Sequence, residues 1–355
     1  MERQDRDLAF MLQYENIAWY ESGSVRILDR RVYPRQVSFV VCHRHEEVAQ
    51  AITDMVTQSA GPFTAAAMGM VLAAWECREK TEKEQLVYLE DAARTISNAR
   101  PTTRARMQLI TGGCLAEAKA ALKEGRDVPE AIVAHTVAAN DLRYAKIGKI
   151  AEYLVDLFPD DGTILTQCFA ETIVGQMLKT ARLRGKKIKL VCAETRPYFQ
   201  GARLTATVAR DMGVDVTVIT DNMPAWYMKS EKIDAFTCAA DVICCDGHVV
   251  NKIGTMQIAL CAREFGVPVY VTGAPDRAHE TVDSVKIEMR DPAFVLQAMG
   301  VKTAADGVKG WYPAFDVTPP KLIDGIVTDL GVYSPFDLKR YFDAGTMGEY
   351  EMILR

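Results

Sequence analysis

In the second half of the chain, short runs of apolar and β-branched residues alternate with segments of helical spacing. The runs predict strands at Thr163–Gln167, Lys187–Ala193, Asp215–Thr220, Val242–Cys245 and Pro268–Thr272, with a short one near Val285–Met289. The segments predict helices at Thr172–Leu183, Ala202–Met212, Met223–Met228, Gly254–Phe265 and Pro320–Leu330. Because a crossover helix makes consecutive strands parallel, this alternation predicts an α/β fold with a Rossmann-like, doubly wound parallel sheet.

The first half of the chain has a different pattern. Two short apolar runs around Glu-Ser-Gly-Ser, between Ile17 and Leu28, predict a β-hairpin. The spacing then becomes helical, and predicts helices at His45–Ser59, Thr64–Glu79, Glu82–Asn98, Thr103–Lys123 and Val128–Leu157. The turn signal Phe158–Gly162 favours a boundary, so we expect a mainly helical domain with a small antiparallel sheet at 1–158 and an α/β domain at 159–355.

The composition argues against several classes of protein. The 355 residues carry a net charge of −5, which gives no indication of a nucleic-acid or membrane-surface partner. No apolar run reaches the ~18 residues of a membrane-spanning helix, and the charged N-terminus lacks the apolar core of a signal peptide. The nine cysteines include no CxxC pair, so we expect a reduced, cytoplasmic protein. The five histidines are scattered, so we expect no metal site.

Polar loops follow the predicted strands. Cys168 comes after the first strand, Glu194–Ala206 after the second and Asp221–Met223 after the third. Because the carboxyl ends of parallel strands meet at one edge of a sheet, we expect a ligand site there. The arginines of the 194–206 loop, beside a helix start, suit an anion such as phosphate; the alternative is a solvated loop whose arginines pair locally. The GxGxxG and Walker A patterns are absent, so the sequence does not support a nicotinamide cofactor or ATP, and we expect no cofactor.

Three residues suggest chemistry from their positions. Cys168 is either a small buried hydrophobic residue or a thiol whose pKa is lowered by the following helix N-terminus. Asp241 begins a strand-like run, where an acid is either a strand-end cap or a functional group. Lys252 precedes a helix that starts with glycine, a position suited to a phosphate or a sugar hydroxyl.

Nearly the whole chain resembles the methylthioribose-1-phosphate isomerases. Their relatives are the ribose-1,5-bisphosphate isomerases and the regulatory subunits of the exchange factor for translation initiation factor 2. The segments that carry the resemblance are Arg100–Thr102, Ile164–Cys168, Glu194–Ala206, Ile219–Met223, Ala240–Asp241, Asn251–Gly254 and Pro313–Pro319. The resemblance implies a helical N-terminal domain, a Rossmann-like C-terminal domain and a homodimer that needs neither metal nor cofactor.

The resemblance also implies roles for single residues. Cys168 and Asp241 match the catalytic cysteine and aspartate of the family, which converts an aldose 1-phosphate to a ketose 1-phosphate. The positions that match phosphate- and sugar-binding residues are Arg100, Gln200 and Lys252, with Asn251 beside them. An acid must protonate the ring oxygen, and Asp241 suits this task with a pKa raised by burial. Cys168 as a thiolate would move a proton from carbon 2 to carbon 1, and a direct hydride shift is the alternative.

The chain departs from the family at several loops. The family's Arg-Gly-Ala-Pro loop corresponds to Gln58–Pro62, which has no arginine, and the Asn-(Thr/Ala)-Gly after the cysteine is Phe169–Glu171. Where the family has an arginine after the catalytic aspartate, this chain has Val242. Where the family has Ala-Asn-Gly-Asp, this chain has Cys245–His248. We therefore expect an aldose–ketose isomerase that acts on 5-methylthioribose 1-phosphate. The alternatives are an isomerase of 5-deoxyribose 1-phosphate or ribose 1,5-bisphosphate, and a regulatory subunit or sugar-phosphate sensor without turnover.

Overall fold

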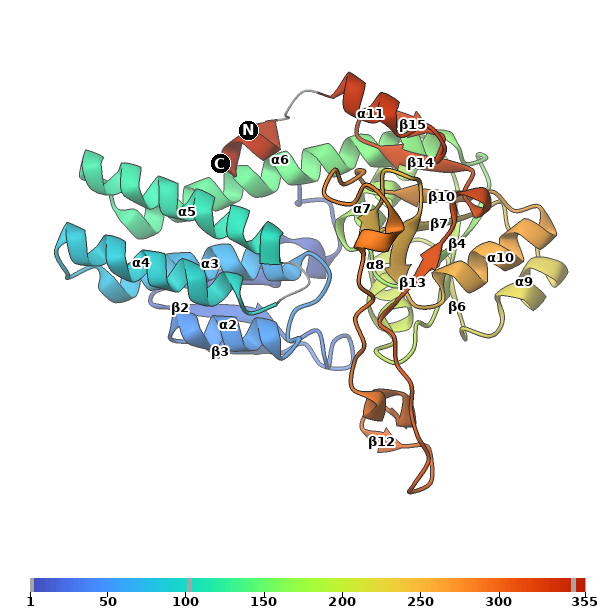
Figure 1. Cartoon of the computed structure of the whole chain (residues 1–355), viewed down its shortest axis with the longest axis horizontal. Coiled ribbons are helices and arrows are strands. Elements are labelled where there is room, and N and C mark those ends of the chain that lie inside the picture. Colours follow the sequence, from blue (N-terminus) through green and yellow to red (C-terminus); the bar gives the residue numbers. More distant parts are fainter. Residues whose placement is uncertain (1–2, 101–103, 346–348, 355) are drawn as a thin grey trace. The chain divides into compact units, whose positions relative to one another are not determined.

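The computed structural model describes residues 3–100, 104–345 and 349–354. The chain forms two compact units, one within residues 1–146 and 346–355 and the other within residues 147–345 (Figure 1). These units differ from the predicted domains of 1–158 and 159–355 in two respects. Helix α6 (Val128–Asp156) contributes residues to both units because it is continuous, and the C-terminal residues belong to the first unit. That residues 1–158 and 159–355 are two separate domains stays a prediction.

The first unit packs helices and a small sheet around one central helix. The antiparallel sheet has the order β1-β2-β3, with β1 at Ala18–Glu21, β2 at Ser24–Leu28 and β3 at Phe39–Cys42. The helices are η1 (Phe10–Leu12), α1 (Tyr14–Ile17), α2 (His45–Thr53), α3 (Gly61–Cys77), α4 (Glu82–Ser97), α5 (Arg104–Glu124), the first part of α6, and α12 (Glu349–Ile353). Helix α3 is apolar on all sides and almost entirely buried, as expected of a helix at the centre of a core.

The predicted helices of the first unit are present, with shifted ends. Helix α2 ends at Thr53 rather than Ser59, because Met55 and Ser59 have positive φ angles that a helix does not allow. Helix α4 begins with a capping box between Thr81 and Glu84, which satisfies the first backbone N–H groups. Thr103, where the next helix was predicted to start, lies outside the described residues.

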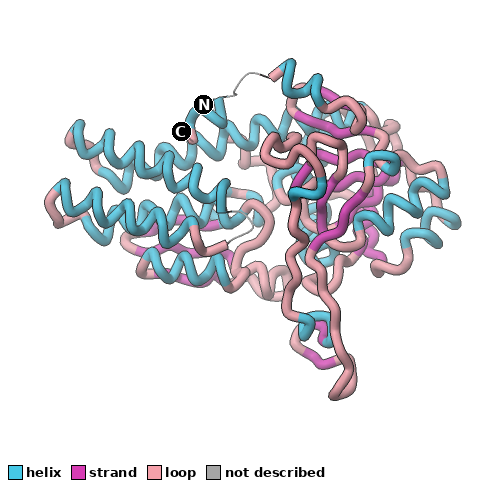
Figure 2. The backbone as a smooth tube through the Cα atoms, in the orientation of Figure 1, coloured by secondary structure: helices cyan, strands magenta, loops and turns pink. Residues whose placement is uncertain are grey.

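The second unit is built on a seven-stranded sheet, which confirms the predicted fold class. The strand order is β15-β14-β10-β7-β4-β5-β6, and all neighbours are parallel except β14 and β15. The strands are β4 (Thr163–Gln167), β5 (Lys189–Ala193), β6 (Val216–Ile219), β7 (Ala235–Ala239), β10 (Val269–Thr272), β14 (Gly325–Thr328) and β15 (Gly331–Tyr333). Figure 2 shows these strands in the middle of the unit, with helices beside them. The helices are α7 (Thr172–Leu183), α8 (Ala206–Asp211), α9 (Pro224–Ser230), α10 (Thr255–Phe265) and α11 (Lys339–Ala344).

The predicted strand Val242–Cys245 is not part of the parallel sheet. Residues Val242–Ile243 form β8 of a separate antiparallel sheet, with β9 (Val249–Lys252) and β13 (Phe315–Thr318) in the order β13-β9-β8. The parallel strand is β7, whose sequence AFTCA lacks the valine and isoleucine by which strands are recognised.

The predicted helix Pro320–Leu330 is wrong. It is a short 3₁₀ turn at Pro320–Leu322 followed by β14. The buried run Ile326–Val327 lies in the sheet, and β-branched residues suit a pleated surface better than a helix. The short strand expected near Val285–Met289 is only an isolated bridge between Met289 and Pro313.

Candidate active site

The reversal of strand order places two candidate residues together. The chain builds β4, β5 and β6 in one direction and then returns to build β7, β10 and β14 on the other side of β4. Ligands of such sheets bind at the carboxyl ends of the strands where the order reverses, here between β4 and β7. Cys168 directly follows β4, and Asp241 follows β7 by two residues. As the sequence indicated, Asp241 stands at the start of a strand, the short β8, and it also lies two residues past the carboxyl end of β7, which was not predicted.

A β-hairpin adds Asn251 and Lys252 to the same edge. Strands β8 and β9 pair in an antiparallel register with Val242 opposite Val250, and the Asp241 N–H donates to the Val250 carbonyl at 3.0 Å. This register continues to place Asn251 across from Asp241. Two residues ten positions apart therefore become neighbours because the chain turns back on itself.

Hydrogen bonds from Gln167 connect the hairpin to the Cys168 loop. Its Nε2 donates to the Ile253 carbonyl at 2.9 Å, and its Oε1 accepts from the Thr255 hydroxyl at 3.0 Å. Asn251 Nδ2 donates to the same hydroxyl at 3.1 Å. The structure thus brings Cys168 close to the hairpin that carries Asn251 and Lys252.

The backbone holds Cys168 in an unusual conformation. Its φ of 63° lies in the left-handed region. Its N–H donates to Thr195 Oγ1 at 2.9 Å, and its carbonyl accepts from Thr205 Oγ1 at 2.5 Å. Both partners belong to the 194–206 loop, so this loop determines the position of the cysteine.

Burial raises the pKa of the Cys168 thiol to about 11. The nearby Lys252 ammonium acts in the opposite direction, as does Arg290, whereas the Asp241 carboxylate raises the pKa further. The expected lowering by the helix N-terminus is therefore outweighed, because removing a thiolate from water costs more than the surrounding positive charge returns. Burial therefore favours the protonated form of the Cys168 thiol at neutral pH.

Asp241 is exposed in the described part of the chain. The second unit by itself therefore does not bury Asp241 in the way that was expected for a general acid. Its charge still acts on the interior of the site, since it raises the pKa values of Cys168 and Cys238.

The arginines of the 194–206 loop support the loop rather than an open anion site. Arg203 donates from Nε and Nη2 to the Tyr198 carbonyl, and Arg196 Nη2 donates to the Gln297 carbonyl at 2.7 Å. The loop is also held by Asp221, whose carboxylate accepts from the Thr195 and Arg196 N–H groups at 2.8 and 2.7 Å. These hydrogen bonds indicate a structural role for the two arginines, and not the predicted role in binding an anion.

Three other candidates are buried polar side chains. Gln200 is 5% exposed, and its Oε1 has no hydrogen-bond partner among the described residues. Lys252 is also 5% exposed; its Nζ donates to the Ala314 carbonyl at 3.1 Å and lies 4.4 Å from the centre of the Phe315 ring. Asn251 is buried beside them. A buried acceptor without a partner is costly, so the Gln200 side chain suits a hydrogen-bonding ligand.

Arg100 belongs to the first unit and is partly buried. Pro101 and Thr102, which complete its motif, lie outside the described residues. Its role at a site of the second unit therefore stays a prediction.

Two charged residues of the site were missed by the sequence reasoning. Asp316 accepts from the Gly254 N–H at 2.7 Å and the Met256 N–H at 3.2 Å, and so caps α10. Burial raises its pKa to about 6. Arg290, whose Nε donates to Glu288 Oε1 at 2.8 Å, lowers the pKa of the Cys168 thiol through its charge. The available signal for Asp316 was the Pro313–Pro319 segment, and Arg290 directly follows the strand expected at Val285–Met289.

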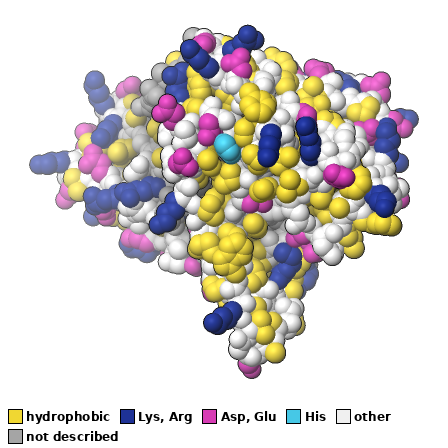
Figure 3. Space-filling model, turned by 45° about the vertical axis from the view of Figure 1, so that its right-hand side comes forward, with side chains coloured by type: hydrophobic (Ala, Val, Ile, Leu, Met, Phe, Trp, Pro, Cys, Tyr) yellow, Lys and Arg dark blue, Asp and Glu magenta, His cyan; other side chains and the backbone are white. Residues whose placement is uncertain are grey.

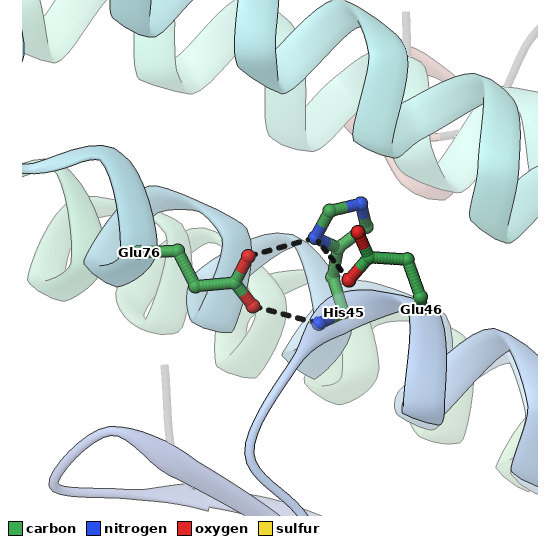
Figure 4. A group of neighbouring side chains, drawn as sticks. All are labelled: His45, Glu46 and Glu76. Atoms are coloured by element: carbon green, nitrogen blue, oxygen red, sulfur yellow. Dashed lines mark hydrogen bonds and ion pairs between the residues drawn. The ribbon is translucent and has the colours of Figure 1, made fainter.

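One group of side chains in the first unit has the composition of a metal site (Figure 4). His45 Nδ1 lies 2.8 Å from Glu76 Oε2 and 3.3 Å from Glu46 Oε2. Both Glu76 oxygens already accept hydrogen bonds, Oε1 from the His45 N–H at 2.7 Å and Oε2 from the Tyr88 hydroxyl. These contacts cap the N-terminus of α2 and join it to α3 and α4, which accounts for the group without a metal ion.

Comparison with known proteins gives a consistent result. The model of the initiation factor 2 subunit family matches residues 57–335. The methylthioribose-1-phosphate isomerase of Pelotomaculum thermopropionicum is 34% identical over 344 residues, which cover 90% of this chain and 91% of that protein. A 5-deoxyribose 1-phosphate isomerase of Clostridium botulinum is 35% identical over 336 residues, 89% of this chain and 95% of that protein. The crystal structure of 5-methylthioribose 1-phosphate isomerase from Pyrococcus horikoshii is 32% identical, with a TM-score of 0.80 over 93% of this chain and 96% of that one.

Proposed function

Because the chain belongs to the initiation factor 2 subunit family, and within it to the methylthioribose-1-phosphate isomerases, we propose that it converts 5-methylthioribose 1-phosphate to 5-methylthioribulose 1-phosphate. This is an aldose–ketose isomerisation of the kind used in methionine salvage. The observation that carries the proposal is the position of Cys168 and Asp241 at the ends of the neighbouring strands β4 and β7. A protein that only binds the sugar phosphate needs no such pair.

The chemistry needs an acid and a hydrogen transfer. The phosphate on the anomeric oxygen prevents the ring from relaxing to a free aldehyde, so the bond between carbon 1 and the ring oxygen must break while that oxygen gains a proton. Asp241 donates this proton. A hydrogen then moves from carbon 2 to carbon 1, and the carboxylate left on Asp241 accepts the proton of the carbon 2 hydroxyl as the ketone forms.

The protonated state of Cys168 bears on the two routes for the hydrogen. As a proton carrier, Cys168 must first become a thiolate, which its pKa of about 11 disfavours at neutral pH. A hydride shift does not need the thiolate, and Phe169, the residue after Cys168, is an apolar side chain that is itself buried. We therefore favour the hydride shift, with the thiol packed against the reacting carbons. The binding roles of Arg100, Gln200, Asn251 and Lys252 are part of the same proposal.

The preferred substrate carries an uncharged group at carbon 5. Glu171, three residues after Cys168, is 1% exposed, so solvent would screen little of any charge interaction between this side chain and a ligand. A second phosphate nearby would be repelled, whereas a methylthio or methyl group would not. The binding free energies of these two apolar groups in a fitted pocket differ by only about 1–3 kcal/mol, so activity on 5-deoxyribose 1-phosphate is expected as well.

The direct test is an NMR assay of ketose formation with three substrates. Methylthioribose 1-phosphate and 5-deoxyribose 1-phosphate should react with higher specificity constants than ribose 1,5-bisphosphate. A preference for the bisphosphate would contradict the substrate assignment. Binding of all three without turnover would instead favour a regulatory subunit or sugar-phosphate sensor.

The proposal includes a homodimer in the cytoplasm. Among the described residues, the cysteines are all free, and no helix is long and apolar enough to cross a membrane. The segment between β10 and β13 extends from the second unit as an arm that ends in β11 (Gln297–Ala298) and β12 (Val301–Lys302) (Figure 1). Apolar side chains gather on the arm and at its base (Figure 3), and Trp311 is 75% exposed. Light scattering would test the dimer, and a monomer at micromolar concentration would contradict it.

A further inference from the structure

Arg290 is fixed near Lys252 by backbone pairing at the base of the arm. The Arg290 N–H donates to the Tyr312 carbonyl at 2.9 Å, and the Ala314 N–H donates to the Glu288 carbonyl at 2.8 Å. On its other side, the Ala314 carbonyl accepts from the Ile253 N–H at 3.1 Å. The segments that carry Arg290 and Lys252 therefore flank the same stretch of backbone, although 38 positions separate the two residues (290 − 252).

The two cationic side chains lie beside one aromatic ring. Lys252 Nζ is 4.4 Å and Arg290 Cζ is 5.8 Å from the centre of the Phe315 ring. The Arg290 guanidinium also lies close to the hydroxyl groups of Tyr198 and Tyr312. The Arg290 side chain is 11% exposed and Lys252 is 5% exposed, so both charges lie in a largely buried, aromatic environment.

The carboxylates near this pair are already engaged. Glu288 binds the Nε side of Arg290, with a second contact from Nη2 to Oε2 at 3.4 Å. Asp316 accepts the backbone N–H groups at the start of α10. A guanidinium has five N–H donors, so an ion pair on one side leaves donors for a second anion. Two buried cations beside the same ring favour an anionic ligand that contacts both.

The substrate chemistry identifies this anion, given the function proposed above. The hydrogen moves between carbons 2 and 1 beside Cys168, and the phosphate is attached to carbon 1 through a single oxygen. The phosphate must therefore lie within a few ångströms of the thiol. The charges of Lys252 and Arg290 both lower the pKa of this thiol.

We infer that Arg290 binds the 1-phosphate of the substrate together with Lys252. Arg290 thereby supplies, from within the catalytic unit, a guanidinium of the kind that the stretch Gln58–Pro62 lacks. A guanidinium beside an ammonium suits a phosphate dianion, since it can donate two parallel hydrogen bonds.

Binding of inorganic phosphate tests this inference without requiring turnover. Calorimetric titration of the full chain should show an increase in the phosphate dissociation constant on the order of 10- to 100-fold for Arg290→Gln, the usual effect of losing a charged hydrogen bond. Arg290→Lys should keep part of the affinity, because the charge remains but the planar fork is lost. The matched control is Arg263→Gln on the exposed side of α10, which should bind phosphate like the wild type.

Kinetics separate a binding role from a structural one. Arg290→Gln should raise KM and the phosphate inhibition constant in parallel, with a smaller change in kcat. Unchanged phosphate affinity in a folded Arg290→Gln or Arg290→Lys protein would overturn the inference, even if turnover falls. If the wild type binds phosphate through Arg290 but forms no ketose from any pentose 1-phosphate, the inference about the anion site stands and the proposed reaction fails.

Discussion

Cys168 and Asp241 follow β4 and β7, two adjacent parallel strands on either side of the point where the strand order reverses. The carboxylate is close enough to raise the pKa of the thiol. The two residues are distant in the chain, because β5 and β6 come between them. They are brought together because β5 and β6 lie on the other side of β4 from β7. Their relationship leads to the first two predictions.

Removal of either group should stop the reaction without unfolding the protein. Cys168→Ser and Asp241→Asn should each lower kcat by roughly 100-fold or more, the usual effect of deleting a positioned acid–base group. The NMR assay measures turnover, and circular dichroism and the melting temperature check the fold. Cys261→Ser, on α10, is the matched control and should retain wild-type turnover. Near-normal turnover in either site variant would remove that residue from the mechanism.

The alkylation rate of Cys168 should report the charges around it. With a pKa of about 11, the thiol should react slowly with iodoacetamide at neutral pH and faster with each step in pH up to that value. Lys252→Ala removes a charge that lowers the pKa, so alkylation at a fixed pH should slow down. Asp241→Asn removes a charge that raises the pKa, so alkylation should speed up. Mass spectrometry of the Cys168 peptide measures both rates, and equal rates in the two variants would place these charges away from the thiol.

Asp316 should make the stability of the protein depend on pH in the acidic range. Its pKa of about 6 in the folded chain exceeds its ordinary value of 3.8, because the folded protein buries the carboxylate. The folded state therefore holds the proton more tightly, and the stabilising contribution of protonated Asp316 is complete below about pH 4 and lost as the pH rises through about 6. As the pH rises through this window, the urea midpoint of the wild type should fall relative to that of Asp316→Asn. A difference that stays constant from pH 4 to 7 would contradict the raised pKa.

Gly201 should tolerate no side chain. A Cβ at this position would lie 1.8 Å from the Ala193 carbonyl oxygen, so the start of the helical segment would have to move away from β5. Gly201→Ala should lower the free energy of unfolding by roughly 1–3 kcal/mol, as expected for overpacking. The control Gly112→Ala, at an exposed position in α5 with open space around it, should raise this free energy by roughly 0.5–1 kcal/mol. Chemical denaturation compares the two variants, and an unaffected Gly201→Ala protein would show that the helix start can shift at little cost.

The sequence by itself determined the class of the fold, because period and composition are local properties. The apolar runs at 163–167 and 269–272 are β-branched and buried on both faces, so their own residues identify them as strands. The strand β7 was missed because Thr237 and Cys238 give it no such pattern; it is a strand because β4 and β10 bind it on both sides. The helix predicted at 320–330 failed for the same reason, since pairing with β10 decided the conformation of Ile326 and Val327.

The candidate site shows the same division between local and tertiary information. The motifs around Cys168, Asp241 and Lys252 were visible in the sequence, and their positions after strands predicted a common edge of the sheet. Only the tertiary structure decided the state of these groups, because burial and charge depend on neighbours that are distant in the chain. Its surroundings raise the pKa of the Cys168 thiol, and Arg290 joins Lys252 because the arm pairs with the segment before β13. Spacing in the sequence carries no information on either contact.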